Sequence, residues 1–336
     1  MIEGATAVTI FYDKDLEFME LQARSFARYV PEGVFGRIIL INNSPRRTRS
    51  AAWKGLVKLY GPHRHLVEVV DARDVYAMPA MDGWMAQQVL KLAISLQVKT
   101  DLYVLLDAKN HFVGPIDRDF FCHADGLPYL DSDNYVDHPL QDFLVRSLAL
   151  FDLSSKEYIK CFYQTITPFV MYTSVVRAMI AEMERQEGRS FAEVMRDRLV
   201  TEFFTYEAFI CKTYGTVEKH YHVRPIPPGS VKDVVWPETN GYDDIHEIID
   251  HIDRTGHKIF SFHRRAGRGL TSQSRDLLAG FWIRRGLLDN RRQARSFFAR
   301  QRYKLMSESA SNIGMRVVRK IRVLAARAGG GAGQRS

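Results

Sequence analysis

The sequence predicts an α/β fold in which one domain, residues 1–285, has a central, mostly parallel sheet flanked by helices. Three observations lead to this fold class. Short runs rich in Val, Ile and Leu alternate with segments of helical periodicity, as in β-α-β units. The run at residues 102–106 is apolar without alternation, as expected of a central strand covered on both faces. The 336 residues are enough for one large α/β domain or two small ones.

The elements follow in order along the chain. Strands are expected at residues 7–11, 37–43, 66–70 and 102–106. Leu16, Met19 and Phe26 have helical spacing between the first two strands, which should therefore run parallel. The later half predicts helices at 173–186, 191–212 and 273–286 and a strand at 258–262. Residues 128–134, which contain Asp131-Ser-Asp133, and the Pro-rich residues 225–229 are expected to be loops.

The charge of the chain is concentrated at its C-terminal end. Residues 284–336 carry fourteen Lys and Arg and two acids, a net charge of +12, which leaves −4 of the total of +8 for residues 1–283. An RNA-binding fold should carry its basic residues, interleaved with aromatics, on the body itself. The acidic body argues against nucleic acid as a partner.

The C-terminal tail, residues 286–336, is predicted to be a basic, helical or disordered segment. On a helix over residues 313–327, Ile313, Val317 and Leu324 lie on one arc and Arg316, Arg319 and other cations lie mostly opposite. Such a helix binds an anionic membrane surface, where each cation contributes about 1 kcal/mol. The alternative is a solvated or disordered terminus.

Three widely spaced cysteines without a C-x-x-C pair exclude a disulfide framework and the usual cysteine zinc sites. They fit a reducing compartment. The first residues lack a signal-peptide pattern, and no later stretch approaches the ~18 apolar residues of a membrane span. The expected location is the cytoplasm, with the basic tail holding the protein at the inner membrane.

The most informative segment is residues 83–115. On a helix beginning near Trp84, the side chains of Trp84, Gln88 and Lys91 form a polar stripe beside an apolar one. The strand at 102–106 then leads directly into Asp107, Lys109 and Asn110, and ligands of open α/β sheets bind outside the carboxyl ends of strands. The structural alternatives are that Lys91 extends to solvent, that Gln88 caps a turn and that Asp107 only caps a turn.

This segment resembles an uncharacterised bacterial family of GT-A-like glycosyltransferases, which have the nucleotide-diphospho-sugar transferase fold. The family carries a W-x-x-Q-Q-x-x-K-L helix, a hydrophobic strand and an L-D-S-D-T-type turn ending in proline. The resemblance spans most of residues 5–285. Here it is carried by Asp15 and Ser25, Trp84 with Gln88 and Lys91, Leu106 to Pro115, Thr167-Pro168-Phe169, residues 201–206, and Phe262-His263-Arg264.

The resemblance implies a divalent metal, Mn²⁺ or Mg²⁺, held by an Asp-x-Asp turn and by a later His, and bridging the two phosphates of the donor. Asp107 matches the first acid and His263 is the candidate for the later ligand. Lys109 stands where the second acid belongs, so the motif is degenerate, and an ammonium cannot ligate a metal. Metal dependence is therefore doubtful. Lys109 instead offers a cation to the diphosphate, an attraction of about 4 kcal/mol at ~4 Å and an effective dielectric of ~20, before desolvation. Asp131-Ser-Asp133 ranks second as a metal site.

Further along the chain, Glu202 is the leading candidate for the base that deprotonates the acceptor hydroxyl, and Tyr206 lies one helical turn from it. The alternative is a solvated Glu202 beside a core Tyr206. Thr167 is assigned to the acceptor side. His263 and Arg264 follow a strand in a combination suited to phosphate, although an isolated His is more often structural. His220-Tyr-His222 has the pattern of a surface strand without carboxylate partners in evident range, and it is assigned no metal.

The expected function is transfer of a sugar from a nucleotide-diphosphate-sugar donor to a glycan or lipid-linked acceptor in cell-surface polysaccharide synthesis. The predicted residues are catalytic Asp107 and Glu202; donor-binding Trp84, Gln88, Lys91, Lys109, Asn110 and Arg264; metal-binding Asp107 and His263; and acceptor-side Thr167 and Tyr206. One alternative is a non-catalytic relative that binds nucleotide sugars or acts as a scaffold. A nucleotidyltransferase is less expected, because residues 11–15 lack a Gly-rich, Arg-containing loop.

Overall fold

The structure, a computed structural model, describes residues 4–45, 50–225 and 233–307. The chain divides into two compact units, which are treated separately below. Unit 1 comprises Met1–Val234 and Ile248–Ser261, and unit 2 comprises Val235–Glu247 and Phe262–Ser336. The predicted membrane-binding helix at residues 313–327 and most of the predicted Pro-rich loop lie outside the described residues.

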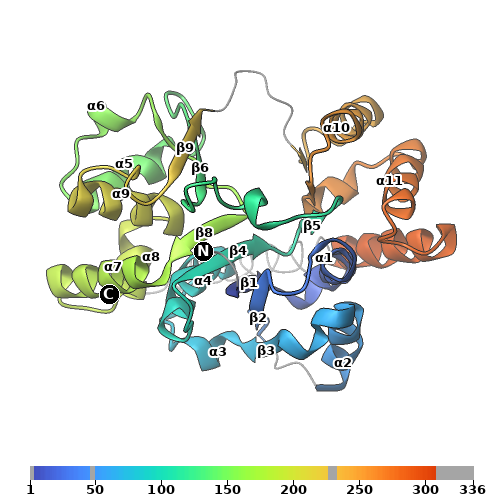
Figure 1. The fold of residues 1–336 in the computed structure, drawn as a ribbon, viewed down its shortest axis with the longest axis horizontal. Coiled ribbons are helices and arrows are strands. Elements are labelled where there is room, and N and C mark those ends of the chain that lie inside the picture. Colours follow the sequence, from blue (N-terminus) through green and yellow to red (C-terminus); the bar gives the residue numbers. More distant parts are fainter. Residues whose placement is uncertain (1–3, 46–49, 226–232, 308–336) are drawn as a thin grey trace, which may run out of the picture. The chain divides into compact units, whose positions relative to one another are not determined.

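Unit 1 is built on a five-stranded sheet with the order β3-β2-β1-β4-β8 (Figure 1). Its strands are β1 (Ala5–Phe11), β2 (Phe35–Asn42), β3 (Val67–Asp71), β4 (Leu102–Asp107) and β8 (Phe169–Tyr172). β1 pairs in parallel with β2 and β4, and β2 pairs in parallel with β3. Only the edge pair of β4 and β8 is antiparallel among these strands. The predicted central, mostly parallel sheet is therefore confirmed, with β4 inside it.

Helices cover both faces of this sheet. Successive strand residues point to opposite sides, so each strand contributes side chains to two separate apolar clusters. Val8 and Ile10 of β1 pack in one apolar cluster with the residues of α4 (Gly83–Ala93), α7 (Thr173–Glu187), α8 (Phe191–Arg198) and α9 (Glu202–Tyr214). Ala7 and Phe11 pack in a second cluster with α1 (Leu16–Tyr29) and α2 (Ser50–Leu59). The predicted non-alternating strand β4 has residues in both clusters, as a strand covered on both faces must.

Two features of unit 1 differ from the sequence prediction. The helix expected at 191–212 is two helices, because Leu199 adopts a left-handed conformation (φ 52°) that ends α8, and α9 begins at Glu202. Asp131-Ser-Asp133, expected in a loop, lies in β6 (Tyr129–Asp133). β6 pairs with β7 (Phe162–Tyr163) and β9 (His222–Pro225) in a small sheet that local propensity does not predict.

The remaining elements are short or flank the sheets. They are α3 (Ala72–Val75), β5 (Asn110–Phe112), α5 (Gln141–Leu150), α6 (Ser155–Tyr158), β10 (Val234–Val235), α10 (Tyr242–Thr255), β11 (Ile259–Phe262) and α11 (Ser272–Arg284). β11 pairs antiparallel with β5 through residues Ile259 to Ser261. This pairing matters for the site, because β5 begins three residues after the end of β4.

Unit 2 has its own small core around Trp282 of α11. The Trp282 ring packs on Phe297 and Phe298 of a helix over residues 291–307, at centroid distances of 5.1 and 5.7 Å. A pocket of this unit is lined by apolar side chains and by five arginines. The arginines are Arg268, Arg275, Arg291, Arg295 and Arg302. Part of the predicted basic tail is thus ordered helix packed on α11.

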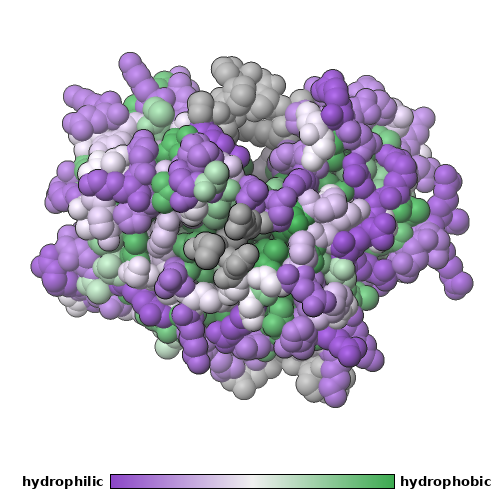
Figure 2. Space-filling view, in the orientation of Figure 1, coloured by the Kyte–Doolittle hydropathy of each residue, from purple (hydrophilic) through white to green (hydrophobic). Residues whose placement is uncertain are grey.

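The described surface is mixed in polarity. On the face drawn in Figure 2, hydrophobic residues occupy separate small areas among hydrophilic ones. Within the described residues, every helix is too short or too polar to cross a bilayer.

Candidate functional site

Asp107 ends β4 and carries the first carboxylate of the candidate site. Its Oδ1 lies 3.3 Å from Nζ of Lys91, and its Oδ2 lies 3.0 Å from Nζ of Lys109. The side chain of Asp107 is 31% exposed and that of Lys109 is 24% exposed. The carboxyl end of a central strand therefore presents a carboxylate and an ammonium at the surface, as the sequence predicts.

Lys91 links Asp107 to Glu202 inside the protein. Its ammonium lies 2.9 Å from Oε1 of Glu202, and its side chain is 8% exposed. The ammonium also lies 4.7 Å from the centroid of the Phe203 ring. The alternative that Lys91 extends to solvent is wrong, because two carboxylates hold its charge in the interior.

The charges of this cluster fix one another in their ionised forms. Burial alone would lower the pKa of Lys91, but the carboxylates of Asp107 and Glu202 raise it above its usual range. Burial alone would raise the pKa of Asp107, but the ammonium groups of Lys91 and Lys109 lower it below its usual range. Asp107 is therefore an anion, and Lys91 a cation, across the physiological pH range.

Asn110 holds the turn after β4 in place. Its Oδ1 accepts hydrogen bonds from the backbone N–H of Asp107 (2.6 Å) and from Oγ1 of Thr167 (2.7 Å). Its Nδ2 donates to Oγ of Ser261 in β11 (2.7 Å). Gln22 of α1 donates to the backbone carbonyls of Asp107 and Asn110. Asn110 is fully buried and these contacts hold the turn, while the assignments of Asn110 to the donor and of Thr167 to the acceptor side stay predictions.

Trp84 and Gln88 occupy the same helix as Lys91. Asp82 caps α4 by accepting from the backbone N–H groups of Trp84 and Met85. Trp84 is 47% exposed as a residue, and its ring lies against the Phe143 ring with 5.5 Å between centroids. Gln88 is buried, and its Nε2 donates to the carbonyl of Trp84, which fits the alternative that it closes a turn. Trp84 is thus the exposed member of the predicted stripe.

The start of α4 is tightly fitted to the loop after β1. A Cβ atom at Gly83 would collide with the hydroxyl of Tyr12. That hydroxyl accepts a hydrogen bond from Nδ2 of Asn43 (2.9 Å), which also donates to the Gly83 carbonyl (3.3 Å). Glycine at position 83 lets the helix that carries Trp84 and Lys91 approach the ends of β1 and β2.

The two acids of α9 have different surroundings. Glu202 forms an ion pair with Lys91. Glu207 is fully buried, and neither of its carboxyl oxygens has a hydrogen-bond partner among the described residues. Burial, and then the charge of Glu202, raise the pKa of Glu207 well above its ordinary value. Tyr206, the predicted acceptor-side residue, is buried, and its hydroxyl bonds to Tyr221 and accepts from the N–H of Tyr172. Its role at an acceptor stays a prediction.

His263 and Arg264 belong to unit 2, whereas Asp107 belongs to unit 1. His263 follows β11, as predicted, and its ring lies 5.2 Å from that of Trp236. Arg264 begins a short 3₁₀ helix, and its carbonyl accepts from Gln301. The assignment of these residues to a metal and to the donor stays a prediction.

The residues around Asp107 do not fit the divalent metal that the resemblance implies. Mg²⁺ and Mn²⁺ take carboxylate, phosphate and water oxygens. Each oxygen of the Asp107 carboxylate already faces an ammonium, at 3.3 and 3.0 Å, and a dication there would meet both positive charges. The second-ranked pair offers no better site, because Asp131 is paired with Arg224 at 2.8 Å.

A group that sequence reasoning missed lies elsewhere in unit 1. His123, Asp125 and His222 bring their ligand atoms within 4.8 Å of one another. The prediction that His222 has no carboxylate near it is wrong, because Asp125 Oδ2 lies 3.8 Å from its Nδ1. The sequence signal, His123-x-Asp125, is weak without knowledge of the pairing of β6 with β9.

Residues 6–237 match a family of proteins of unknown function. No curated protein matches the chain. The solved structures similar to it include the bifunctional glycosyltransferase WbbM in its apo form, with 14% identity, a TM-score of 0.45, and coverage of 78% of this chain and 46% of that one. They also include the glycosyltransferase GlyE of Streptococcus pneumoniae TIGR4, with 12% identity, a TM-score of 0.42, and coverage of 88% of this chain and 64% of that one. A third is the galactosyltransferase LgtC in complex with donor and acceptor sugar analogues, with 10% identity, a TM-score of 0.38, and coverage of 58% of this chain and 70% of that one. The chain thus spans less than half the length of WbbM.

Proposed function

The chain belongs to the family of unknown function DUF6492, and we propose that it is a glycosyltransferase that takes a sugar from a nucleotide-diphosphate-sugar donor. The observation that carries the proposal is the ion-paired group at the end of β4: Asp107 between Lys91 and Lys109. A carboxylate suits the hydroxyls of a sugar or ribose, and an exposed ammonium suits a diphosphate. Both stand at the carboxyl end of a central strand, where open α/β sheets bind ligands.

The spacing along α4 supports a ligand the size of a nucleotide sugar. Trp84 and Lys91 are seven residues apart, so the exposed indole lies roughly 10 Å along the helix axis from the buried lysine that contacts Asp107. An exposed indole offers a stacking surface for a base or a sugar ring. In this proposal the donor extends from Trp84 towards the Asp107 turn.

The reaction breaks the bond between the sugar C1 and the phosphate oxygen and forms a bond from C1 to the acceptor oxygen. The electron pair of the broken bond leaves with the nucleoside diphosphate, and the charge that develops there is stabilised by nearby cations. Lys109 is proposed for this role. The acceptor proton passes to a carboxylate, and of the two predicted catalytic acids Asp107 is 31% exposed and Glu202 is 3% exposed. Asp107 is therefore the more accessible of the two, although the ammonium groups that lower its pKa weaken it as a base, and Glu202 is proposed to position Lys91.

The test is to incubate the purified protein with a panel of nucleotide sugars, with and without Mn²⁺, and to measure donor binding and release of free nucleotide. Saturable binding of one donor without Mn²⁺ is the expected result. Lys109→Met should weaken that binding. The matched control is Lys99→Met, which removes the same charge from an exposed lysine. Absence of binding to every donor, or equal binding by both variants, would contradict the proposal.

A non-catalytic relative that binds nucleotide sugars is the second candidate. It is favoured by Lys109, since the usual pair of metal-binding acids is missing from the turn. Donor binding without nucleotide release, in the presence of a range of glycan and lipid-linked acceptors, would support this second function over the first.

The acceptor and the place of action are also part of the proposal. We expect a glycan or lipid-linked acceptor of cell-surface polysaccharide synthesis, reached by a protein that binds the inner membrane through its basic tail. Phe297 and Phe298 of the helix over residues 291–307 pack on Trp282, so the useful truncation ends at Ser307. The shortened protein should bind less to anionic vesicles than the full chain, and unchanged binding would remove the tail from the proposal.

A further inference from the structure

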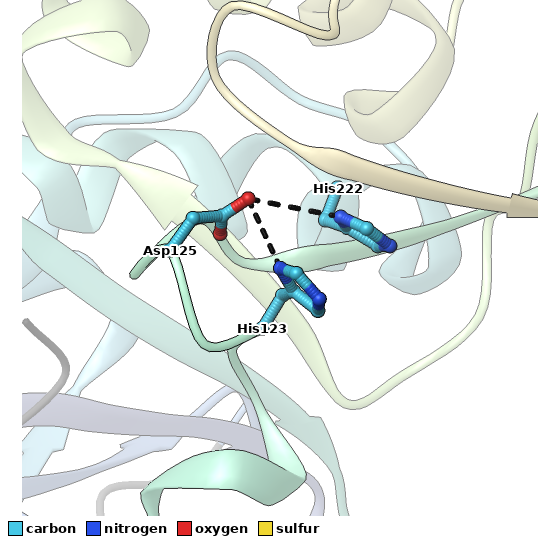
Figure 3. A group of neighbouring side chains, drawn as sticks. All are labelled: His123, Asp125 and His222. Carbon is cyan, nitrogen blue, oxygen red and sulfur yellow. Dashed lines mark ion pairs between the residues drawn. The ribbon is translucent and has the colours of Figure 1, made fainter.

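We propose that His123, Asp125 and His222 form a binding site for a divalent transition-metal ion, for which Zn²⁺ is the best match. Figure 3 shows the two imidazole rings side by side, with the carboxylate of Asp125 facing both. Asp125 Oδ2 lies 3.0 Å from Nδ1 of His123 and 3.8 Å from Nδ1 of His222. The two rings stack with centroids 3.8 Å apart. None of the three residues belongs to the Asp107 site, so this inference is independent of the proposed function.

The backbone brings these residues together by two separate means. His123 and Asp125 lie in a tight turn, in which the N–H of His123 donates to the carbonyl of Leu127 and Gly126 has a φ of +86°. His222 comes from β9, ninety-seven residues further along the chain, and its N–H donates to the carbonyl of Pro128. The register of β9 against β6 pairs His222 with Tyr129. The side chains therefore start from fixed backbone positions.

The donor atoms suit a borderline metal ion. Two imidazole nitrogens and one carboxylate oxygen form a set used by zinc and other first-row metals, which take such ligands at about 2.0–2.2 Å. Bonds of that length place neighbouring ligand atoms about 3–3.5 Å apart. The separations of 3.0 and 3.8 Å bracket this range, so small side-chain rotations would close the site. Ca²⁺ and Mg²⁺, which take oxygen ligands, do not suit it.

The state of the individual atoms also points to a ligand. Nδ1 of His123 is buried and makes no well-aligned hydrogen bond within the described residues, although Oδ2 is close. The other carboxylate oxygen of Asp125 accepts from the N–H of Leu127 (2.9 Å), which orients Oδ2 towards the rings. Arg224 is the nearby cation on β9, and its charge is matched by Asp131.

The exposure of the three side chains leaves room for a water ligand. They are 40%, 46% and 37% exposed in the order His123, Asp125 and His222. Three protein ligands with a fourth, open position are the pattern of zinc sites that also bind water or a ligand. Bound metal would in addition fasten the turn at residues 122–128 to β9, a link between segments that are distant in sequence.

The test uses the full chain without a polyhistidine tag, treated with a chelator and titrated with Zn²⁺ by calorimetry. One Zn²⁺ per chain is expected. His123→Gln, Asp125→Asn and His222→Gln should each weaken binding by about tenfold or more, since even loss of outer contacts to a metal site costs 10–100-fold. Replacing Zn²⁺ by Co²⁺ should give visible absorption bands in the wild type that these variants lack. Zn²⁺ should also raise the melting temperature of the wild type more than that of the variants.

The matched control is His220→Gln, two residues away, whose ring instead packs on Tyr172 and Tyr214. It should bind Zn²⁺ like the wild type, and far-UV circular dichroism of every variant checks that the fold is kept. Three results would overturn the proposal: no Zn²⁺ binding, affinity unchanged in the three ligand variants, or tighter binding of Mg²⁺ or Ca²⁺ than of Zn²⁺. Donor binding is measured in a separate assay, so a protein that fails to bind Zn²⁺ does not contradict the proposed function.

Discussion

Replacing Lys91 by Met tests the central ion-paired group of the protein. The substitution keeps the length and apolar stem of the side chain and removes the ammonium that contacts Asp107 at 3.3 Å and Glu202 at 2.9 Å. Asp107 is 31% exposed and keeps Lys109 at 3.0 Å, so it retains both water and a cation. Glu202 is 3% exposed and loses the ammonium it faces. Most of the cost should therefore arise at Glu202.

The expected loss in the free energy of unfolding is about 3–5 kcal/mol, the usual effect of removing one partner of a buried pair. The double variant Lys91→Met with Glu202→Gln has no orphaned charge at position 202. It should be more stable than the single variant by about 2–3 kcal/mol, because a well-packed neutral pair often matches a buried ion pair.

Urea unfolding followed by tryptophan fluorescence and circular dichroism measures both values through the midpoint and slope of the transition. Lys99→Met, on the exposed surface, should change stability by no more than about 0.5 kcal/mol. If the double variant is no more stable than Lys91→Met alone, the buried Glu202 charge is not the source of the loss and the reasoning fails.

Three other changes give distinct results. Glu207→Gln should stabilise the protein at neutral pH, because the raised pKa of the buried acid means that the wild type loses stability as pH rises above the unfolded pKa near 4; a difference in urea midpoint between the two proteins that is the same at pH 5 and at pH 8 would contradict this. Asp107→Asn should make the free energy of unfolding depend less on pH in acid. The lowered pKa of Asp107 stabilises the wild type fully above pH ~4, and this stabilisation is lost as pH falls further; the same pH dependence in both proteins between pH 2 and 5 would count against it. Trp84→Ala should weaken donor binding by about 1–3 kcal/mol, as for other base-stacking aromatics, with little change in melting temperature; Tyr242→Ala, another exposed aromatic, is the control.

The large sheet was predictable because its strands are long and bury both faces. β1, β2 and β4 are buried at most positions and each carries a run of apolar residues, so their existence does not depend on partners elsewhere in the sequence. β6, β7 and β9 are five residues or shorter, and β6 and β9 contain charged residues, so all three become strands only through one another. Leu199 gave no sign that it ends a helix, because only the surrounding fold decides when a leucine takes a left-handed conformation.

The same distinction applies to the site. The contact between Lys91 and Asp107 joins residues that are close in the sequence, on α4 and on β4, the next strand along the chain. The contact between Lys91 and Glu202 joins residues 111 positions apart and depends on how α9 packs on α4. Nor could sequence separate Glu202 from Glu207, which lie on one helix but differ in whether a cation reaches them. His123 and His222 meet only through the pairing of β6 with β9.

The fit of Gly83 against Tyr12 constrains how the sequence can vary among relatives. A side chain at position 83 would displace the Tyr12 hydroxyl and with it the hydrogen bond from Asn43. Substitutions at positions 12 and 83 should therefore be correlated during evolution. Family members that keep Tyr12 should keep Gly83, and a larger residue at 83 should appear only where residue 12 has become small. Neither residue need touch a substrate for the pair to be retained, because together they set where Trp84 and Lys91 stand.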